Sequence, residues 1–325
     1  MKHDTVLRVM IVAAAAILPG APTASGQEYP AKTIRIIVPF TPGGGNDIVA
    51  RILGLQLTNL HKQQVIVENR AGAGTIIGVE ALTKSPPDGY TLMVTNNSLA
   101  VNHTLYPKLP YDTLKDVTTV VRVASTPNIL VIHPSVPAKT TREFIALAKA
   151  KPDQLAYSSA GTGSTAFLAA EMFKLFTGVK MLHVPYKGTA PALTAILSGE
   201  TQAMVAALPA TVPHIKGGRL RALGVTSAAR ATGMKEVPTM IEGGVKGFDF
   251  ETWYGLFGPA NLPREIVARL NASVNKIIGL PDVKDQLARQ GIDPAGGTPE
   301  AFDKLFRAEV VTLGKVIRAS GAKPE

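Results

Sequence analysis

Two glycine-rich turns are the stretches of this sequence whose residue types could bind a small molecule. The first lies within residues 38–51 (VPFTPGGGNDIVAR), where Gly43, Gly44 and Gly45 separate a β-branched run from an amphipathic run. Glycine leaves the backbone N–H groups unobstructed where a helix begins and presents its unpaired donors and the positive end of its dipole. The pattern therefore predicts a turn that holds an anion, without specifying which anion.

The second turn, residues 159–164 (SAGTGS), repeats the order of strand, small polar turn and helix. Here Ser159, Thr162 and Ser164 add hydroxyl groups to the backbone donors, and Ser98 offers another hydroxyl in a separate polar loop. A hydrogen bond to a charged group contributes about 1.5 to 3 kcal/mol, so three or four such donors suffice to bind a carboxylate without arginine. Each hydroxyl could equally cap a helix or stabilise a turn.

Neither turn carries a complete nucleotide-binding motif. A P-loop has Lys and Ser or Thr after its last glycine, whereas Asn46 and Asp47 follow it here. Gly161, Gly163 and Ala166 match a dinucleotide fingerprint, but no acidic residue lies about 20 positions further on to bind a ribose. The position of Asp47 in the first helical turn favours stabilisation of the helix N-terminus, by roughly 0.3 to 1 kcal/mol, over ligand contact.

The sequence does not display a catalytic constellation. Ser273 and Lys276 match S-x-x-K, but they lie inside a predicted helix without the companion S-D-N and K-T-G elements. A nucleophile elbow and an H-E-x-x-H motif are also absent, and the six histidines are isolated along the sequence, which favours loop or surface positions. The sequence therefore predicts no catalytic residue, no metal ligand and no cofactor.

Length and composition favour two globular domains in an exported protein. The chain has 325 residues, of which 46% are hydrophobic and 18% charged. Lys2 and Arg8 precede an apolar run at residues 9–18, followed by small residues, which predicts a signal peptide over residues 1–26 and a periplasmic location. That run is about half of the roughly 20 residues that a membrane span requires. The lack of cysteine excludes a disulfide scaffold and a lipid anchor.

The net charge of +10 raises the question of a polyanionic partner. Lysines and arginines are scattered singly, and only 6% of the residues are aromatic, so the pattern does not indicate nucleic-acid binding. In an exported protein this basicity is better suited to attracting small anions or anionic surfaces.

Alternating strand and helix patterns surround both turns and predict an α/β protein with parallel sheets. Strands are expected at residues 33–38, 65–68, 90–95, 118–125, 129–132, 155–158, 181–184, 202–208 and 222–226. In the first half of the chain, helices are expected from the first turn to about residue 60, at 75–84 and at 140–151. One further helix follows the second turn, another runs from the turn at 185–188 to about residue 198, and the last three are expected at 263–278, 281–290 and 299–320.

Two lobes follow from this order, with a passage between them near Pro127 and a return near residues 248–254. Ligands in open α/β sheets bind beyond the carboxyl ends of the strands, where both turns lie, so the expected site is the cleft between the lobes. Trp253 and Tyr254, at the return passage, could form an apolar ligand wall or pack the hinge. The expected division assigns residues 27–126 plus 252–325 to lobe 1 and residues 127–251 to lobe 2.

Several further stretches, in order along nearly the whole mature chain, resemble the Bug-type extracytoplasmic solute receptors of tripartite tricarboxylate transport systems. Together they are far more specific than a single glycine motif. The matching stretches are PFTPGGGNDIVAR at 39–51, VENRAGAG at 67–74, KSPPDGYTL at 84–92, YSSAGTGS at 157–164, VPYKG at 184–188, LRALGVTS at 220–227 and VPTMIEGGVKGFDFETWYGLFGPANLP at 237–263.

The resemblance implies a two-lobed, type II-like periplasmic-binding-protein fold, with a mostly parallel sheet flanked by helices in each lobe. In this family, donors of the two glycine turns and ordered water bind a ligand carboxylate. Where many relatives carry a histidine soon after the second turn, this chain has Phe167, so ligand identity does not transfer. The ligand-binding residues implied are Phe40, Thr41, Gly43 and Gly44 on one wall, Ser159, Gly161, Thr162 and Ser164 on the other, and Asn97, Ser98, Tyr186 and Asp249 for the rest of the molecule.

The expected function is that of a monomeric, non-catalytic periplasmic receptor. It would bind a small mono- or dicarboxylate between its lobes and present it to a membrane permease. The alternative, from a different class, is an exported α/β hydrolase or esterase. That activity requires a nucleophile with a base beside it, a pair that the sequence does not reveal.

Overall fold

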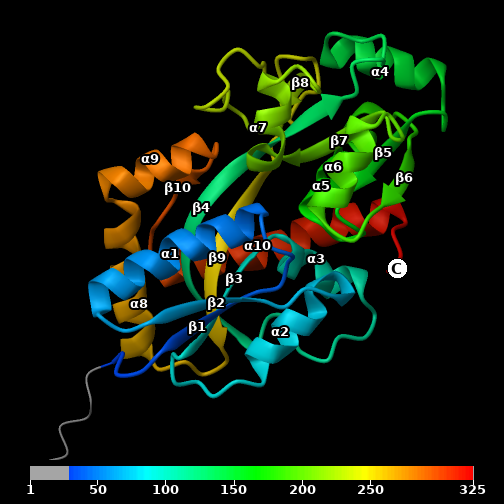
Figure 1. Ribbon diagram of the computed structural model, residues 1–325. Helices are drawn as coiled ribbons and strands as arrows, with labels where there is room; N and C mark the ends of the chain where they lie inside the picture. Colours follow the sequence, from blue (N-terminus) through cyan, green and yellow to red (C-terminus); the bar gives the residue numbers. More distant parts are fainter. Residues whose placement is uncertain (1–28, 325) are drawn as a thin grey trace, which may run out of the picture.

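Ten strands form one curled sheet that passes through both lobes of the computed structural model, which describes residues 29–324 (Figure 1). The predicted signal peptide, residues 1–26, lies outside the described residues. Along the main path of the sheet the strand order is β2-β1-β3-β9-β4-β7-β5-β6, while β8 and β10 pair with β4 to the side of this path. The two-lobed α/β architecture expected from the sequence is confirmed.

The strands of the two lobes share one pattern. The outer strands of each lobe pair in parallel, whereas the central strands β4 and β9 pair antiparallel with their neighbours, so the sheet is mixed. The lobe 1 strands are β1 (Ile34–Val38), β2 (Val65–Asn69), β3 (Thr91–Asn96), β9 (Glu251–Pro259) and β10 (Asp293–Pro294). The lobe 2 strands are β5 (Ala156–Ser159), β6 (Leu182–Pro185), β7 (Ala203–Ala207) and β8 (Arg221–Val225).

A single strand, β4 (Val117–Ile132), connects the lobes, where the sequence predicted two strands on either side of Pro127. Its first part pairs with β9 as far as Pro127, and its second part pairs with β7 from Asn128 onward. Pro127 thus lies where β4 changes partners, a place at which the missing N–H breaks no continuous ladder. The prediction of a break at this proline was therefore wrong.

Helices cover both faces of the sheet in each lobe (Figure 1). In lobe 1, one face packs against α1 (Gly45–His61), α8 (Arg264–Ile278) and α9 (Pro281–Arg289), and the other against α2 (Ile76–Thr83), α3 (Ser98–Leu105) and α10 (Pro299–Ser320). In lobe 2, one face packs against α4 (Thr141–Ala150) and α5 (Thr165–Thr177), and the other against α6 (Thr189–Leu197) and α7 (Leu208–Lys216).

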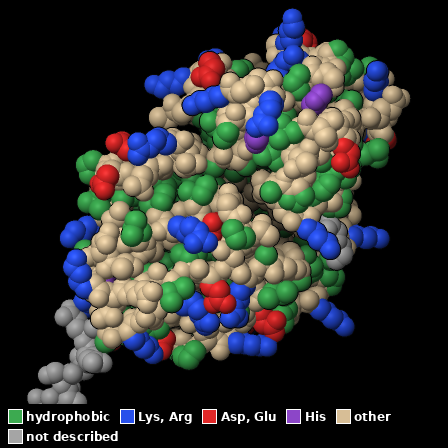
Figure 2. All heavy atoms as spheres, in the orientation of Figure 1, with side chains coloured by type: hydrophobic (Ala, Val, Ile, Leu, Met, Phe, Trp, Pro, Cys, Tyr) green, Lys and Arg blue, Asp and Glu red, His purple; other side chains and the backbone are tan. Residues whose placement is uncertain are grey.

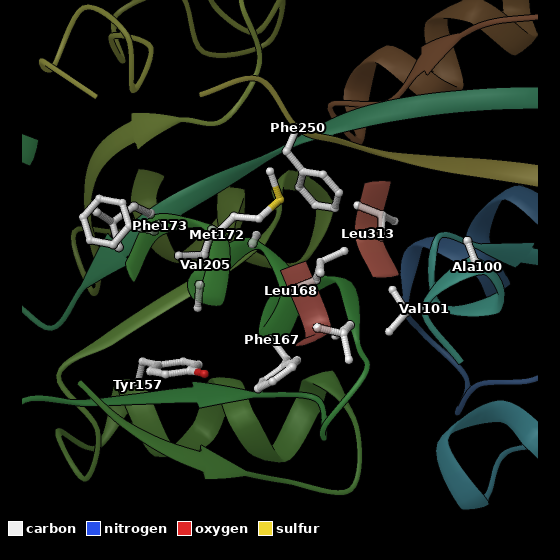
Figure 3. Packing of buried hydrophobic residues seen from close by; sticks show 14 of the residues in the cluster. Ala100, Val101, Tyr157, Phe167, Leu168, Met172, Phe173, Val205, Phe250 and Leu313 are labelled. Atoms are coloured by element: carbon white, nitrogen blue, oxygen red, sulfur yellow. The ribbon is translucent and has the colours of Figure 1, made fainter. Parts of the chain in front are cut away.

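The apolar core does not stop at the boundary between the lobes. Ala100 and Val101 from α3, Leu168 from α5 and Leu313 from α10 belong to one buried cluster (Figure 3). Helix α10 packs against both α3 of lobe 1 and α5 of lobe 2. The C-terminal helix therefore holds the two lobes against each other on the side away from α1.

Helices α4 and α10 begin where their capping residues predicted. Thr140 accepts a hydrogen bond from the Glu143 N–H at 3.1 Å, and Thr298 accepts one from the Ala301 N–H at 3.2 Å with Pro299 in the first helical position, as predicted. Two helices were not expected. One is α3, which begins at Ser98 of the predicted polar loop, and the other is α7, which follows β7 directly where the sequence indicated no helix.

Candidate functional site

The first glycine turn joins the end of β1 to the start of α1 and presents an open surface. Gly43 has a φ of +87°, which favours glycine, whereas Gly44 has an ordinary φ of −84°. A methyl group built on either residue would meet no described atom within 4 Å. Thr41 in the same turn is exposed, and Phe40 is half-buried. This wall therefore has room for a ligand beside its backbone.

Asp47 braces this turn from inside α1. Its carboxylate accepts hydrogen bonds from the Gly43 N–H, the Arg51 Nε and the Asn69 Nδ2, each at 3.0 Å. Asn69 also donates to the Phe40 carbonyl at 3.1 Å. Burial by itself raises the pKa of Asp47. The hydrogen bonds from Arg51, Gly43 and Asn69 together lower it by more, so the net pKa lies below its ordinary value. Asp47 lies in the first turn of α1, as predicted, but it braces the preceding turn through Gly43 and is not an N-cap, since the N-cap Gly44 has no side-chain hydrogen bond.

One part of the sequence prediction needs correction at this turn. The Gly43 N–H was expected to be unobstructed, but it donates to Asp47. The donors left for an anion are those of the N-cap residue Gly44 and of the first helical residues, Gly45, Asn46 and Asp47, because N–H groups in a first turn have no intrahelical partner. Gly45 is required by packing, since a Cβ there would lie 2.1 Å from the hydroxyl of the buried Tyr254.

The second turn joins the end of β5 to the start of α5 and is held by neutral groups. Gly161 and Gly163 have φ values of +107° and +86°. Ser164 caps α5, because its hydroxyl accepts a hydrogen bond from the Phe167 N–H at 3.2 Å. A hydroxyl that accepts in this way can still donate its own hydrogen, so capping and ligand binding by Ser164 are compatible.

Ser159 is fully buried at the start of this turn and is bonded within the protein. Its Oγ accepts a hydrogen bond from the Gly161 N–H at 3.2 Å and lies 2.6 Å from the Nε2 of His183. The His183 ring in turn packs against Tyr157 and Phe167, with ring centroids 4.9 and 4.7 Å apart. Ser159 therefore supports the turn from behind, and Phe167 is part of that support.

This Ser159–His183 contact corrects the expectation that no nucleophile has a base beside it. His61 likewise lies 3.0 Å from the Ser273 hydroxyl. Neither serine meets the requirement for a nucleophile, which must expose its oxygen to substrate. Ser159 is 0% exposed and Ser273 is 7% exposed. Pairs brought together over 24 and 212 residues could not be found from sequence spacing.

The two lobes touch at both turns. A Cβ on Gly163 would lie 2.7 Å from Leu105 and 3.3 Å from the Asn102 Oδ1, both on α3 of the opposite lobe. A Cβ on Gly188, in the loop after β6, would lie 3.1 Å from the Thr41 Oγ1. The structure thus brings α3 to the second turn and the β6–α6 loop to the first turn.

Asn97, between β3 and α3, and Ser98, the first residue of α3, occupy two different environments. Asn97 is fully buried, and its amide binds the Glu251 carbonyl at 3.2 Å, the Glu309 carboxylate at 3.0 Å and the Trp253 N–H at 3.1 Å. The Ser98 hydroxyl is also buried, but it has no hydrogen-bond partner among the described residues. A buried hydroxyl without a partner is costly, and Ser98 is one of eight side-chain groups in the described residues in this position.

The remaining predicted residues lie further out in lobe 2. The Tyr186 hydroxyl donates to Glu200 at 2.8 Å, and the Asp249 carboxylate accepts from the Ala228 N–H at 3.1 Å. Burial and the neighbouring Glu200 raise the pKa of Tyr186. Both side chains are thus engaged within lobe 2.

Trp253 packs its ring on three aromatic side chains of β9 and α10. The rings of Phe257, Phe302 and Phe306 lie 5.3 to 6.2 Å from it between centroids. The indole is only 2% exposed. Of the two roles left open by the sequence, these contacts fit packing of the hinge.

Two residues at the cleft had no signal, or a weak one, in the sequence. Asn102, which donates to the Gly74 carbonyl at 2.7 Å and to the Thr75 hydroxyl at 3.0 Å, lies on the unexpected helix α3. Gly188 stands in one of the stretches that resemble the receptor family, but its contact with Thr41 crosses between lobes.

A groove of about 940 Å³ lies elsewhere, at the end of lobe 2 between α4, β8 and the loop at residues 234–243. Two of its charged side chains are engaged within the protein: Glu242 binds Arg230 at 3.0 Å, and Arg221 donates to two backbone carbonyls. Neither glycine turn contributes a residue to the lining of this groove. Within residues 29–324 there is no group of three side chains placed to hold a metal ion, and no helix is long and apolar enough to cross a membrane.

The architecture and the cleft define a two-lobed periplasmic binding protein. Figure 2 shows the face hollowed between the lobes, with lysines and arginines scattered over it rather than gathered in one patch. Residues 49–322 match the family described as the tripartite tricarboxylate transporter family receptor. The chain belongs to this family, which confirms the resemblance drawn from the sequence.

Individual relatives agree with this assignment. The chain is 38% identical over 301 residues to protein BugT of Bordetella pertussis, covering 92% of each protein. Its fold is similar to R. palustris Rpa4515 with adipate, with a TM-score of 0.87 and 33% identity over 92% of this chain and 100% of that one. It is also similar to MatC of Rhodopseudomonas palustris with bound malate, with a TM-score of 0.83 and 30% identity over 89% of this chain and 100% of that one.

Proposed function

We propose that this protein is an extracytoplasmic receptor that binds a small organic mono- or dicarboxylate between its lobes and delivers it to a membrane permease. The observation that supports this most directly is the meeting of the two lobes at both glycine turns, Thr41 against Gly188 and Gly163 against α3. Two solved relatives, named with adipate and with malate, support a carboxylate as the ligand class.

The twelve predicted residues divide into two roles in this proposal. Five of them bind the ligand directly, and the other seven hold the turns and the neighbouring segments in position. Direct contacts come from the backbone at Gly44 and from the hydroxyls of Thr41, Ser98, Thr162 and Ser164. Supporting roles fall to Phe40, Gly43, Asn97, Ser159, Gly161, Tyr186 and Asp249. The lobes divide as residues 27–126 plus 252–325 and residues 127–251.

The receptor acts without catalysis in this proposal. Ser159 and His183 form the one serine–histidine contact beside the cleft in the described part of the chain, and there the serine oxygen is buried and bonded to Gly161. An esterase would need that oxygen exposed beside an oxyanion site. Export to the periplasm and action as a monomer complete the proposal.

A thermal-shift screen of the mature protein against C3–C6 mono- and dicarboxylates, including malate and adipate, tests the receptor function. Ligand at 100 times its Kd should add about 2.7 kcal/mol to the free energy of unfolding. A p-nitrophenyl ester assay on the same protein tests the hydrolase alternative. No shift across the panel together with ester turnover that Ser159→Ala abolishes would overturn the receptor proposal.

A further inference from the structure

Glu309, near the middle of α10, accepts hydrogen bonds from two segments that belong to other parts of the fold. Its Oε2 accepts the Trp253 indole N–H at 2.6 Å and the Asn97 Nδ2 at 3.0 Å. Asn97 also accepts the Trp253 backbone N–H at 3.1 Å. The three residues therefore form a closed triangle, through the side chains of Glu309 and Asn97 and both the indole and the backbone N–H of Trp253, that joins α10, β9 and the junction between β3 and α3.

The junction that this triangle holds leads directly into Ser98, the first residue of α3. The Ser98 N–H donates to the Asn96 side chain at 3.0 Å, while its hydroxyl is buried without a partner among the described residues. The side chain of Asn97, immediately before Ser98, makes three hydrogen bonds, to the Glu251 carbonyl, the Glu309 carboxylate and the Trp253 N–H. The position of the Ser98 hydroxyl thus depends on Asn97, and through Asn97 on Glu309.

The same helix reaches the opposite lobe. Leu313 lies one turn after Glu309, on the same face of α10, and belongs to the cluster that includes Val101 of α3 and Leu168 of α5 (Figure 3). Trp253 pairs with Ser125 on β4, next to the residues at which both long strands pass between the lobes. A shift of α10 relative to β9 would therefore be felt at Asn97.

We propose that Glu309 is a positioning residue for the ligand site, which fixes the Asn97–Ser98 loop to the hinge strand β9 and to α10. The acceptor oxygen of Glu309 sets the position of the loop, and its charge sets how tightly the loop is held. A charged acceptor makes hydrogen bonds roughly twice as strong as a neutral one.

The charge of Glu309 changes within the physiological pH range. Burial raises its pKa to about 7, although the hydrogen bonds from Trp253 and Asn97 and the charge of Arg122 on β4 act in the opposite direction. Of the other elements packed against it, β9 and the β3–α3 loop contribute a neutral indole and a neutral amide. On its own helix, Arg307 is paired with Asp303 at 2.6 Å.

The chain provides its own reporter, because Trp253 is its single tryptophan. Indole fluorescence of the ligand-free protein, followed from pH 5 to pH 9, should change with a midpoint near 7. Glu309→Gln, which keeps an acceptor oxygen but cannot ionise, should remove this transition. Asp303→Asn, which neutralises an exposed carboxylate on the same helix, should leave it unchanged.

Hydrogen exchange separates positioning from general stability. In Glu309→Leu, which removes both acceptor oxygens, amides of residues 97–105 should exchange at least tenfold faster at pH 8, while those of α4 in lobe 2 keep their rates. Glu309→Gln should lie between Glu309→Leu and the natural protein. Unchanged exchange at residues 97–105 in Glu309→Leu, or a fluorescence transition that persists in Glu309→Gln, would overturn the proposal.

A third experiment measures ligand binding, with adipate and malate as probes, and rests on the proposed function. Glu309→Leu should weaken the binding of whichever acid binds the natural protein by about tenfold at pH 8, whereas Glu309→Gln should stay within about threefold. If neither acid binds the natural protein, the receptor proposal loses support, and the two ligand-free measurements still decide the role of Glu309. Equal affinities of the Leu variant and the natural protein would contradict the positioning role.

Discussion

The two glycine turns share one order of elements but are held in place by different chemistry. The turn before α1 is braced by the Asp47 carboxylate, and all of its supporting hydrogen bonds come from lobe 1. The turn before α5 is braced by neutral hydroxyls, and its Gly163 packs against α3 of the opposite lobe. The first turn is therefore braced within its own lobe and meets the other lobe only where Thr41 lies beside Gly188, whereas the second turn packs its Gly163 into α3 of the opposite lobe.

Because of this difference, opening of the cleft should affect the two walls differently. Separation of the lobes leaves the bonds of Asp47 with Gly43, Arg51 and Asn69 intact, because these residues move together. The same movement removes the contact of Gly163 with Leu105 and Asn102. We therefore expect a ligand to meet a preformed first wall and to complete the second wall by closure.

The largest expected effect comes from a matched pair of substitutions, Gly163→Ala and Gly43→Ala. The two glycines have nearly the same φ, +86° and +87°, so alanine costs about 1 to 2 kcal/mol of backbone strain at either position. Only at Gly163 does the added methyl meet a neighbour, Leu105 at 2.7 Å. Overpacking should add about 1 to 3 kcal/mol there. Urea unfolding of both variants measures the difference.

The double variant Gly163→Ala/Leu105→Ala provides the control for this pair. Removing the Leu105 side chain leaves space for the new methyl, so the coupling between the two sites should be at least 1 kcal/mol. Equal stabilities of Gly163→Ala and Gly43→Ala would mean that the second turn does not pack against α3 in solution.

Asp47→Asn should have the next largest effect, because it tests the charged brace of the first turn. Loss of the carboxylate weakens three hydrogen bonds to Gly43, Arg51 and Asn69 and places an amide N–H against their donors. We expect a loss of about 1.5 to 3 kcal/mol in the free energy of unfolding. Chemical denaturation at pH 7 measures it, and Asp303→Asn, at an exposed ion pair, serves as the control with a loss under about 0.5 kcal/mol.

The pH dependence gives this test a second readout. The pKa of Asp47 is lowered in the folded protein, so its contribution is present above the ordinary value of 3.8 and is lost as the pH falls through the folded value. Asp47→Asn should therefore lose less stability than the natural protein between pH 4 and pH 2. Parallel acid-unfolding curves would show that the carboxylate does not brace the turn.

Local patterns predicted much of this fold, and long-range contacts account for what they missed. Thr298 and Pro299 mark the start of α10 because a cap and a first-turn proline act within a few residues. The continuity of β4 through Pro127 was missed because its partners are more than 70 residues away in the sequence. Whether a proline ends a strand depends on those partners.

The candidate site divides in the same way. The glycine turns and the place of Asp47 in the first turn of α1 could be predicted, since each depends on neighbours along the chain. The partners of Asn97 could not, because Glu309 and Trp253 lie 212 and 156 residues away. Nor could the buried position of Ser159, which is bonded to His183 from the neighbouring strand β6. Residues that bind the ligand and residues that support the turns look alike in sequence, and only such long-range contacts distinguish them.

A smaller effect on stability is expected for Ser164→Ala, which tests the neutral brace. Loss of the cap on the Phe167 N–H should cost about 1 kcal/mol. If the hydroxyl also donates to a ligand carboxylate, affinity should fall by about 10- to 100-fold, as measured by calorimetry with the acid found in the screen. Ser164→Thr, which keeps a hydroxyl cap, is the control. Unchanged affinity in Ser164→Ala would limit this residue to capping.

Gly44→Ala should change stability least, and for that reason it isolates the first wall as a ligand surface. Gly44 has a φ of −84°, which alanine adopts without strain, and a methyl there meets no described atom within 4 Å. We expect a stability change of about 0.5 kcal/mol or less, in line with other unpacked surface positions. The methyl would, however, occupy the space that a carboxylate needs beside the backbone, so binding should fall at least tenfold.

The same substitution at Gly178, which caps α5 away from the cleft with open space around it, controls for loss of glycine, although its φ of +70° adds strain there. Full affinity in Gly44→Ala would place the ligand away from the first turn and make the second turn the main binding wall.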